Sequence, residues 1–219
     1  MQLWELLSIH PGVTALIGGG GKTTMMYTLA QELAERGSVI CTTTTRIFPP
    51  DHMPVLERAD RELMARQRCV CLGTPAQAGK LAAPTQPMAE LALLADYVLV
   101  EADGSKGMPL KAHLPHEPVI PAEAGQTVVL AGASAFGQLA REAVHRLEVF
   151  CRLTGLDPDS AVTPEAAAAV LTAEAMGDKI FVNQAETERT LADARRLAAA
   201  VEIPVYAGAL QRGEWICLS

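Results

Sequence analysis

A run of glycines followed by a lysine and two threonines is the part of the sequence best suited to chemistry. It consists of Gly18, Gly19, Gly20, Gly21, Lys22, Thr23 and Thr24. Glycines let the backbone take positive φ and turn successive amides toward one point, and a helix that begins near Lys22 adds the positive end of its dipole. Lys22 would bridge the outer phosphates of a nucleotide, and the Thr23 hydroxyl would complete a magnesium shell. The run therefore predicts a binding site for ATP or GTP with Mg²⁺.

The run departs from the usual phosphate-loop pattern. That pattern has a glycine six positions before the lysine, where this sequence has Leu16, and Ile17 stands where one subgroup carries a second lysine. The loop is short and closer to the Gly-x-x-Gly-Lys-Thr-Thr form of Mur-type ligases. A ligase therefore remains an alternative at this point.

Two acids follow a buried strand expected at Tyr97–Val100, where a neighbouring carboxylate usually holds the nucleotide's magnesium. Glu101 and Asp103 are two residues apart, so they point the same way if the strand continues through them. We expect them to bind the metal together with Thr23, one of them orienting the attacking water. Lys22, Glu101, Asp103 and Lys106 form the expected catalytic set.

A second group of residues could hold a second substrate or the transferred phosphoryl group. Lys106 and Lys111 lie in the Gly-Ser-Lys-Gly-Met-Pro-Leu-Lys stretch and could neutralise phosphoryl charge. At the end of the second expected strand, four hydroxyls precede an arginine. Thr43, Thr44, Thr45 and Arg46 are expected to contact an anion, because strand ends line the ligand crevice of such sheets. The histidines His113 and His116 are assigned no metal.

Asn183 and Glu186 loosely match the Asn-Lys-x-Asp motif with which many GTPases read guanine, although Gln184 replaces the lysine. We expect Asn183 and Glu186 to contact the nucleotide and leave the base undecided. Cys69 and Cys71 alternate onto one face of a strand. Buried small side chains are their default interpretation, and a redox or selenium-handling pair is the alternative.

The elements around these residues alternate between strands and helices, which predicts an α/β fold with a mostly parallel sheet and helices on both faces. Strands are expected at Val13–Ile17, Val39–Thr42, Cys69–Leu72, Tyr97–Val100, Thr127–Leu130, Ile180–Val182, Val205 and Trp215–Leu218. Helices are expected at Leu3–Ser8, Thr23–Arg36, Val55–Gln67, a short segment closing at Leu94, Gln138–Thr154, Pro164–Ala173 and Glu188–Ala200. Residues 75–87 and 105–126 are expected to be irregular.

Length and composition set further limits. The 219 residues suit one P-loop NTPase-like domain, with a small helical insertion around 138–176. Apolar residues make up 49% and mean hydropathy is +0.17, enough for a sizeable core. The net charge of −7 argues against a nucleic-acid binder. Without a membrane-length apolar run or a signal peptide, we expect a cytoplasmic protein, and five cysteines without zinc-type spacing argue against a disulfide framework.

Together these motifs resemble the YqeC-type proteins, accessory factors for selenium-dependent molybdenum hydroxylases. The resemblance rests on the strand and glycine loop over 13–24, the threonine run at 42–45, Glu101–Gly107, and the stretches 109–112 and 116–121. It implies a P-loop nucleotide hydrolase that works in maturation of a molybdenum enzyme, with that hydroxylase or its cofactor-maturation proteins as partners.

Three functions stay open from the sequence. The first is an NTPase that drives maturation of a metalloenzyme. The second is a kinase or ligase that transfers a phosphoryl group to a small acceptor held by residues 105–121. The third is a nucleotide sensor or chaperone without catalysis. The sequence leaves the oligomeric state open.

Overall fold

The computed structural model describes every residue from Met1 to Ser219. The chain divides into two compact units, and the boundary passes through the glycine loop between Lys22 and Thr23. The first unit comprises Met1–Leu16, Thr23–Gly104 and Val119–Thr127; the second comprises Ile17–Lys22, Ser105–Pro118 and Val128–Ser219. Strands and helices alternate in both units and most strand pairs are parallel, so the predicted α/β class is confirmed. The single domain with a helical insertion stays a prediction.

The first unit contains a five-stranded parallel sheet in the order β1-β8-β2-β5-β4. Its strands are β1 (Gly12–Gly18, of which the last two residues belong to the second unit), β2 (Val39–Thr43), β4 (Val55–Leu56), β5 (Cys69–Leu72) and β8 (Tyr97–Glu101). Its helices are α1 (Leu3–Leu6), α2 (Lys22–Leu33), α3 (Arg61–Arg66) and α4 (Met88–Leu94). The central strands β2 and β8 are buried throughout, as expected for a parallel sheet covered on both faces.

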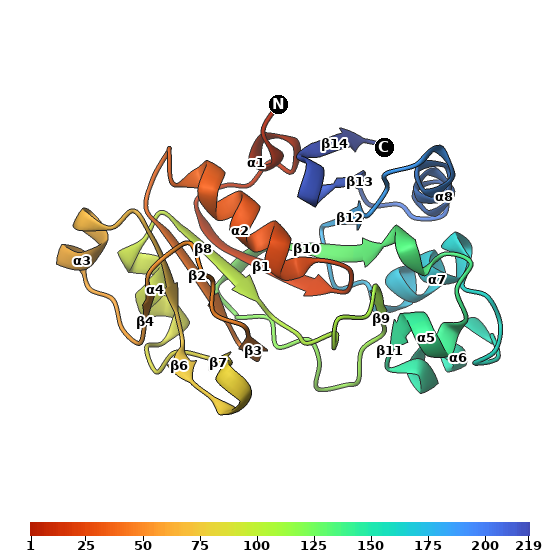
Figure 1. Ribbon diagram of the computed structural model, residues 1–219, viewed down its shortest axis with the longest axis horizontal. Helices are drawn as coiled ribbons and strands as arrows, with labels where there is room; N and C mark the ends of the chain where they lie inside the picture. Colours follow the sequence, from red (N-terminus) through yellow and green to blue (C-terminus); the bar gives the residue numbers. More distant parts are fainter. The chain divides into compact units, whose positions relative to one another are not determined.

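Alternation along these strands separates two faces. Ile40, Val70 and Val98 pack with Met64 of α3 and Leu91 of α4 in one apolar cluster. The other face therefore carries the residues in between, and α2 lies on it, because its Thr23 is bonded to Glu101 of β8. Figure 1 shows α2 running along β1. The face under α2 therefore carries Glu101, one of the predicted site residues.

Two predictions in the first unit need correction. The helix expected at Val55–Gln67 is only α3, because Val55–Leu56 pairs with β5 and the Asp60 carboxylate caps the helix at Leu63 N. Residues 75–87 are less irregular than predicted. A small antiparallel sheet contains β3 (Arg46–Ile47), β6 (Thr74–Pro75) and β7 (Leu81–Ala82), with a 3-10 turn, η1, at Gln77–Gly79.

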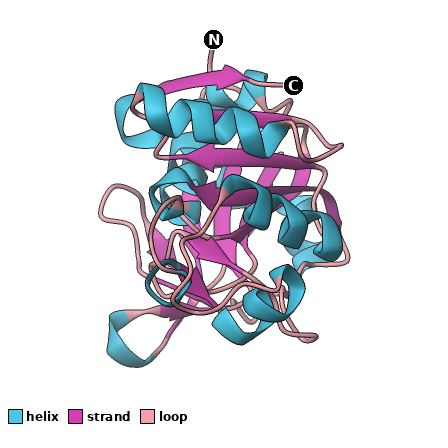
Figure 2. Cartoon of the chain, turned by 90° about the vertical axis from the view of Figure 1, so that its right-hand side faces the viewer, coloured by secondary structure: helices cyan, strands magenta, loops and turns pink.

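The second unit holds strands in the order β10-β12-β13-β14, parallel except for the last pair. They are β10 (Ala124–Gly132, which starts in the first unit), β12 (Lys179–Asn183), β13 (Val205–Ala209) and β14 (Glu214–Cys217); β9 (Leu110–Lys111) pairs with β11 (Val144–His145). The helical elements are α5 (Ala140–Ala143), α6 (Leu147–Thr154), α7 (Pro164–Glu174), α8 (Glu188–Ala198), η2 (Ala133–Ala135) and η3 (Leu210–Arg212). Figure 2 shows the strands and helices by colour.

The predicted helix Gln138–Thr154 is wrong as a single element. It is split into α5 and α6 by the short strand β11 and by Arg146, which takes left-handed φ of 65°. The side chain of Arg146 is bonded to Glu117, a tertiary contact that the helical pattern of the sequence does not contain. In contrast, α7 begins as predicted, with the Thr163 hydroxyl accepting from Ala166 N and Pro164 in the first turn.

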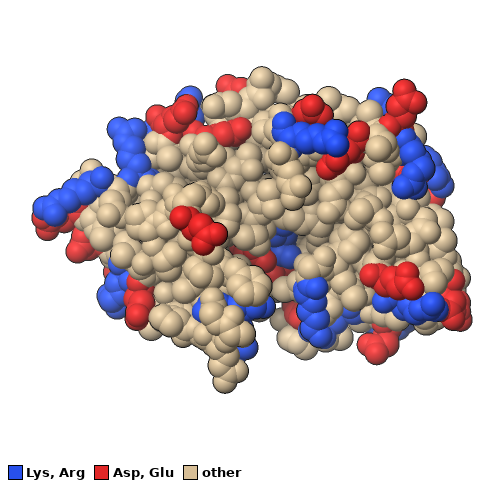
Figure 3. Space-filling view, in the orientation of Figure 1, with Lys and Arg blue, Asp and Glu red and all other residues tan.

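The surface carries charges of both signs. On the face shown in Figure 3, lysine and arginine side chains alternate with aspartate and glutamate, separated by wide uncharged areas. No helix is both long enough and apolar enough to cross a membrane.

Candidate functional site

The glycine loop connects β1 to α2, so the predicted strand–loop–helix arrangement is confirmed. Three of its residues take left-handed backbone conformations, with φ of 93° at Gly18, 79° at Gly20 and 123° at Gly21. L-residues other than glycine rarely adopt these angles. The loop therefore depends on glycine for its curvature.

Crowding gives a second reason for glycine. A Cβ at Gly18 would lie 2.3 Å from the Leu130 carbonyl oxygen, and a Cβ at Gly20 would lie 2.5 Å from Gly132 N. A Cβ at Gly19 would lie 2.7 Å from the Met108 carbonyl oxygen. Backbone atoms cannot move aside as a flexible side chain can. These glycines allow the loop to lie directly against the main chain of β10 and of the segment before β9.

The loop amides do not all point at one place. Gly19 N donates to the Leu130 carbonyl at 3.0 Å, and Gly20 N donates to the Met108 carbonyl at 3.2 Å. These two amides are therefore occupied by main-chain acceptors. The donors best placed for a phosphate lie further along, at Gly21 and in the first turn of α2, where helix geometry leaves the amides without an intrahelical acceptor.

Lys22 is buried, with 3% exposure, and its Nζ donates to the Gly18 carbonyl at 2.6 Å. The ammonium group thus folds back over the loop to which it belongs. The contact with phosphates expected of Lys22 stays a prediction.

The first unit holds the acid that the sequence predicts next to the loop. The Thr23 hydroxyl donates to the Glu101 carboxylate at 2.7 Å, and Glu101 is 7% exposed. A threonine hydroxyl and a carboxylate in this arrangement are hard oxygen ligands of the kind that Mg²⁺ prefers. Asp103, two residues on, is 1% exposed. Thr24 is half-buried in the first turn of α2.

The threonine run has a structural role that the sequence did not predict. The Thr43 hydroxyl donates to the Glu101 carbonyl at 2.8 Å and accepts from Thr45 N, while the Thr44 hydroxyl donates to the Val119 carbonyl. These hydroxyls join the end of β2 to the end of β8 and to the segment that contains Val119. Arg46, in β3, is exposed. The expected contact of these four residues with a substrate stays a prediction.

Asn183 lies at the end of β12 and contacts the glycine loop. Its Nδ2 donates to the Gly20 carbonyl at 2.7 Å, and its Oδ1 accepts from Leu210 N at 3.1 Å. Both ends of the amide are therefore used to join the loop to the segment after β13. Asn183 is a positioning residue for the loop in this conformation.

Gln184 and Glu186, from the stretch that loosely matches the GTPase motif, are engaged as well. The Glu186 carboxylate forms an ion pair with Arg212 at 2.9 Å, and Gln184 takes φ of 63° while its side-chain oxygen accepts from the Ser134 hydroxyl. A guanine contact by Glu186 would have to compete with Arg212.

The segment after the acids contains an ionic cluster that sequence reasoning found only in part. Lys111 is buried in β9 with its Nζ 3.4 Å from Glu117, and Arg146 donates to both oxygens of Glu117. Arg146, followed by Lys111, lowers the pKa of Glu117 to about 2. Lys106, in contrast, is exposed and takes φ of 53°. Nothing in the local sequence around 146 indicates this pairing.

A second buried contact was also missed. Glu174, at the end of α7, accepts from His113 N at 2.6 Å and lies 2.7 Å from its ring Nδ1. His113 is 6% exposed, whereas His116 is exposed. No group of three or more His, Cys, Asp or Glu side chains is arranged to hold a metal ion.

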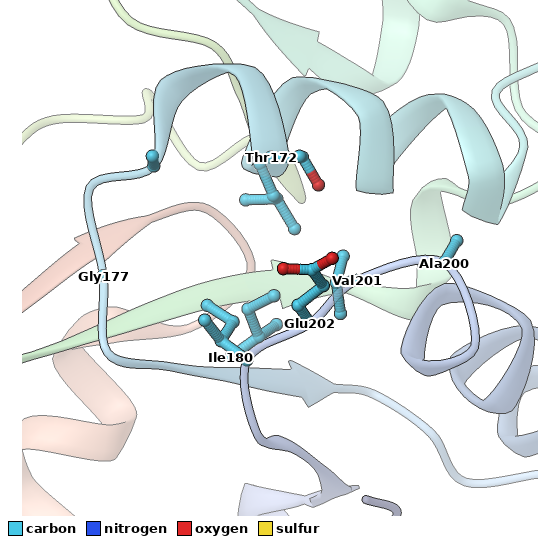
Figure 4. A pocket seen from close by; sticks show the side chains of 9 residues that line it. Thr172, Gly177, Ile180, Ala200, Val201 and Glu202 are labelled. Atoms are coloured by element: carbon cyan, nitrogen blue, oxygen red, sulfur yellow. The ribbon is translucent and has the colours of Figure 1, made fainter.

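A pocket in the second unit lies at the other end of β12 from Asn183. Its volume is about 460 Å³, and it lies between the end of α7, the start of β12 and the segment after α8. Figure 4 shows the Glu202 carboxylate between Thr172 of α7 and Ile180. The remaining lining is mostly aliphatic. The pocket is separate from the glycine loop, because Gly20 contacts the opposite end of the strand.

Comparison with known proteins shows the family to which the chain belongs. An Escherichia coli (strain K12) protein described as "Uncharacterized protein YqeC" is 37% identical over 164 residues, which cover 69% of this chain and 64% of that protein. The chain thus matches less than two thirds of the relative's length. The sequence pattern of the YqeC protein family matches residues 14–148, a stretch that includes the glycine loop and both acids. The chain belongs to the YqeC protein family.

Proposed function

We propose that this chain binds a nucleoside triphosphate at the glycine loop and hydrolyses it with Mg²⁺. The observation that carries the proposal is the 2.7 Å hydrogen bond between Thr23, directly after the loop lysine, and the buried carboxylate of Glu101. A hydroxyl and an acid joined in this way serve as metal ligands in phosphoryl-transfer sites. Mg²⁺ usually takes one or two protein oxygens and completes its shell with phosphates and water.

Each residue has a role in this proposal. Gly21 and the amides of the first turn of α2 bind the phosphates, and Lys22 leaves the Gly18 carbonyl to neutralise their charge. Thr23 and Glu101 hold Mg²⁺. Asp103, buried two residues after Glu101, orients the attacking water. The remaining glycines set the curvature of the loop.

We further propose that turnover serves the maturation of a molybdenum hydroxylase in the cytoplasm. This part rests on the family resemblance, since no residue described above identifies a client. Lys106, Lys111 and residues 43–46 are retained as candidate contacts for an acceptor, which would make the enzyme a kinase or ligase.

Isothermal titration calorimetry with ATP, GTP and CTP in the presence of Mg²⁺ tests the proposal. We expect Lys22→Ala to abolish binding, whereas Lys179→Ala, which removes a lysine from the start of β12, leaves binding unchanged. A nucleotide at 100 times its Kd should also raise the free energy of unfolding by about 2.7 kcal/mol. Unchanged binding by the Lys22→Ala protein would reject the assignment of the loop.

Turnover separates the remaining alternatives. Phosphate release from nucleotide and Mg²⁺ in water alone indicates an NTPase, and release that requires a small acceptor indicates a kinase or ligase. Binding with negligible turnover in the unsubstituted protein indicates a sensor or chaperone.

A further inference from the structure

The pocket of the second unit is formed where three segments meet at the start of β12. They are the end of α7, the connection 175–178, and residues 199–204 between α8 and β13. Ala175 takes left-handed φ of 47° and ends α7, so the chain turns away there. Ile180 N donates to the Pro204 carbonyl, which joins the start of β12 to the segment before β13. The walls of the pocket therefore belong to one compact unit.

The lining combines aliphatic walls with two polar side chains. The volume of about 460 Å³ lies within the range of about 300–1,000 Å³ that is usual for small-molecule sites. Only Thr172 and Glu202 contribute polar side chains to the lining. The aliphatic side chains of the lining are Leu171, Ala175, Ile180, Ala200, Val201 and Ile203. Pockets that bind small molecules typically combine apolar walls with a few polar groups in this way.

Glu202 gives the pocket a negative charge that the protein does not neutralise. Its side chain forms no ion pair and no hydrogen bond within the chain. Figure 4 shows its carboxylate between Thr172 and Ile180, over the aliphatic lining. Lys179 precedes Ile180 in β12, so alternation along the strand turns its side chain to the opposite face. The lining contains no lysine or arginine.

The end of α7 adds partial negative charge at the same place. The last carbonyl groups of a helix lack intrahelical donors and form the negative end of its dipole. The last turn of α7 contains no basic residue. Its two glutamates are already paired, Glu165 with Arg196 and Glu174 with His113. The pocket thus has an unpaired carboxylate and a helix C-terminus beside it, and both favour a cation.

We propose that this pocket binds a small primary amine, whose ammonium group pairs with Glu202 and whose hydrocarbon chain lies against the aliphatic walls. With a pKa of about 10.4, such an amine is charged at neutral pH. Its three N–H groups can donate to the Glu202 carboxylate, the Thr172 hydroxyl and water. A free amine suits the pocket better than a lysine of another protein, because the lining has no further polar side chain for the amides of a peptide. The proposal does not depend on nucleotide binding.

The test is a titration of the full-length, ¹⁵N-labelled protein with hexylamine at neutral pH, followed by the chemical shifts of the backbone amides. We expect saturable shifts at Gly177, Val201 and Glu202. Hexanol and hexanoate have chains of the same length without the positive charge. Hexanol should bind about tenfold more weakly, the loss of one hydrogen bond between charged groups, and hexanoate should not saturate the site. From butylamine to hexylamine, each methylene that becomes buried should tighten binding about fourfold.

Variants separate the charge from the cavity. Glu202→Gln should weaken hexylamine about tenfold, whereas Glu214→Gln, which removes an exposed carboxylate of β14 outside the lining, should leave the affinity unchanged. Thr172→Lys brings an ammonium group to Glu202 and should compete with the added amine. Thr172→Met has a side chain of similar length without the charge and should retain more of the binding than Thr172→Lys.

Four results would overturn the proposal. They are shifts that increase without saturation, shifts confined to amides elsewhere in the chain, equal affinity for hexanol and hexylamine, and unchanged affinity in Glu202→Gln. Tighter binding of Nα-acetyl-lysine methylamide than of hexylamine would reject a free amine as the ligand. The amide spectrum of each variant also shows whether it is folded. If Glu202→Gln is not, the comparison of hexylamine with hexanol in the unsubstituted protein decides.

Discussion

Strand β8 of the first unit ends in a carboxylate, and strand β12 of the second unit ends in an amide; each bonds to one residue of the glycine run. Glu101 accepts from the Thr23 hydroxyl, and Asn183 donates to the Gly20 carbonyl. Both side chains are buried. Each strand thus ends in a buried polar side chain that contacts the glycine run, but one of these side chains is charged and the other is neutral.

The difference indicates different tasks. A carboxylate carries a charge, so it can exchange a hydroxyl donor for a metal ion when a nucleotide arrives. The Asn183 amide is neutral, and both of its polar atoms are satisfied by backbone groups. We infer that the end of β8 serves turnover and that the end of β12 serves the shape of the loop. Substitutions at the two ends should consequently have different effects.

The largest effect is expected from Glu101→Gln. The amide keeps the size of the side chain and can still accept from Thr23, but it loses the charge that would hold Mg²⁺ in the proposed site. A bound metal ion stabilises the charge of the transition state by several kcal/mol. Loss of its ligand should therefore lower kcat about a hundredfold or more. Steady-state phosphate release measures kcat, and calorimetry without Mg²⁺ serves as the control, where affinity should change little. Equal loss of affinity with and without the metal would place Glu101 among the loop-shaping residues instead.

Asn183→Ala should have the next largest effect, and on binding. It leaves the buried Gly20 carbonyl and Leu210 amide without this partner, at about 1–3 kcal/mol for each group. We expect nucleotide affinity to fall about tenfold or more, and equally for ATP and GTP, because the loop loses its shape before any base is read. Competition binding measures both nucleotides in one protein. A loss confined to GTP would show that Asn183 reads the base.

Glu117→Gln tests a carboxylate that, unlike Glu101, is expected to stabilise the fold and not to take part in turnover. The pKa of Glu117 falls from 4.5 to about 2 through Arg146 and Lys111, so the charged form stabilises the folded state. A depressed pKa contributes stability that is present above pH 4.5 and is lost as pH falls toward 2. At neutral pH the variant should lose on the order of 2 kcal/mol in free energy of unfolding, after allowance for solvent screening. Urea unfolding at a series of pH values measures the difference, and a difference that does not change with pH would contradict it.

The smallest effect is expected from Glu186→Ala and Arg212→Ala. Their ion pair is exposed, and such pairs contribute about 0–1 kcal/mol. Thermal unfolding should therefore move little in either variant, and the ratio of ATP to GTP affinity should stay the same. A change in that ratio in Glu186→Ala alone would give Glu186 the role in base recognition that the sequence motif suggests.

The sequence predicted the parts of the candidate site that are local in the chain. The glycine loop, its strand and its helix follow one another directly, and the positive φ values at Gly18, Gly20 and Gly21 are the kind that such a run predicts. The central strands were also predicted from local sequence. A strand covered on both faces needs apolar residues at every position, so a continuous apolar run indicates it. The N-cap of α7 at Thr163 was likewise predicted from the local sequence.

Contacts between distant segments were beyond the sequence. A helical pattern covers residues 138–154, but the bonds from Arg146 to Glu117 accompany a break that no local preference requires. The same holds for the threonine run. Its hydroxyls could serve an anion or a backbone carbonyl equally well, and the structure shows Thr43 on the Glu101 carbonyl.

The sequence by itself thus determined that the chain has a glycine loop between a strand and a helix in an α/β fold, since backbone freedom and burial depend on residue type and order. Only the tertiary structure decided which side chains meet that loop. Asn183 is 163 residues from Gly20, and Glu101 is 78 residues from Thr23. These contacts depend on the order and register of the strands, which cannot be predicted from any single segment of the sequence. Register also placed Cys41 beside Cys71.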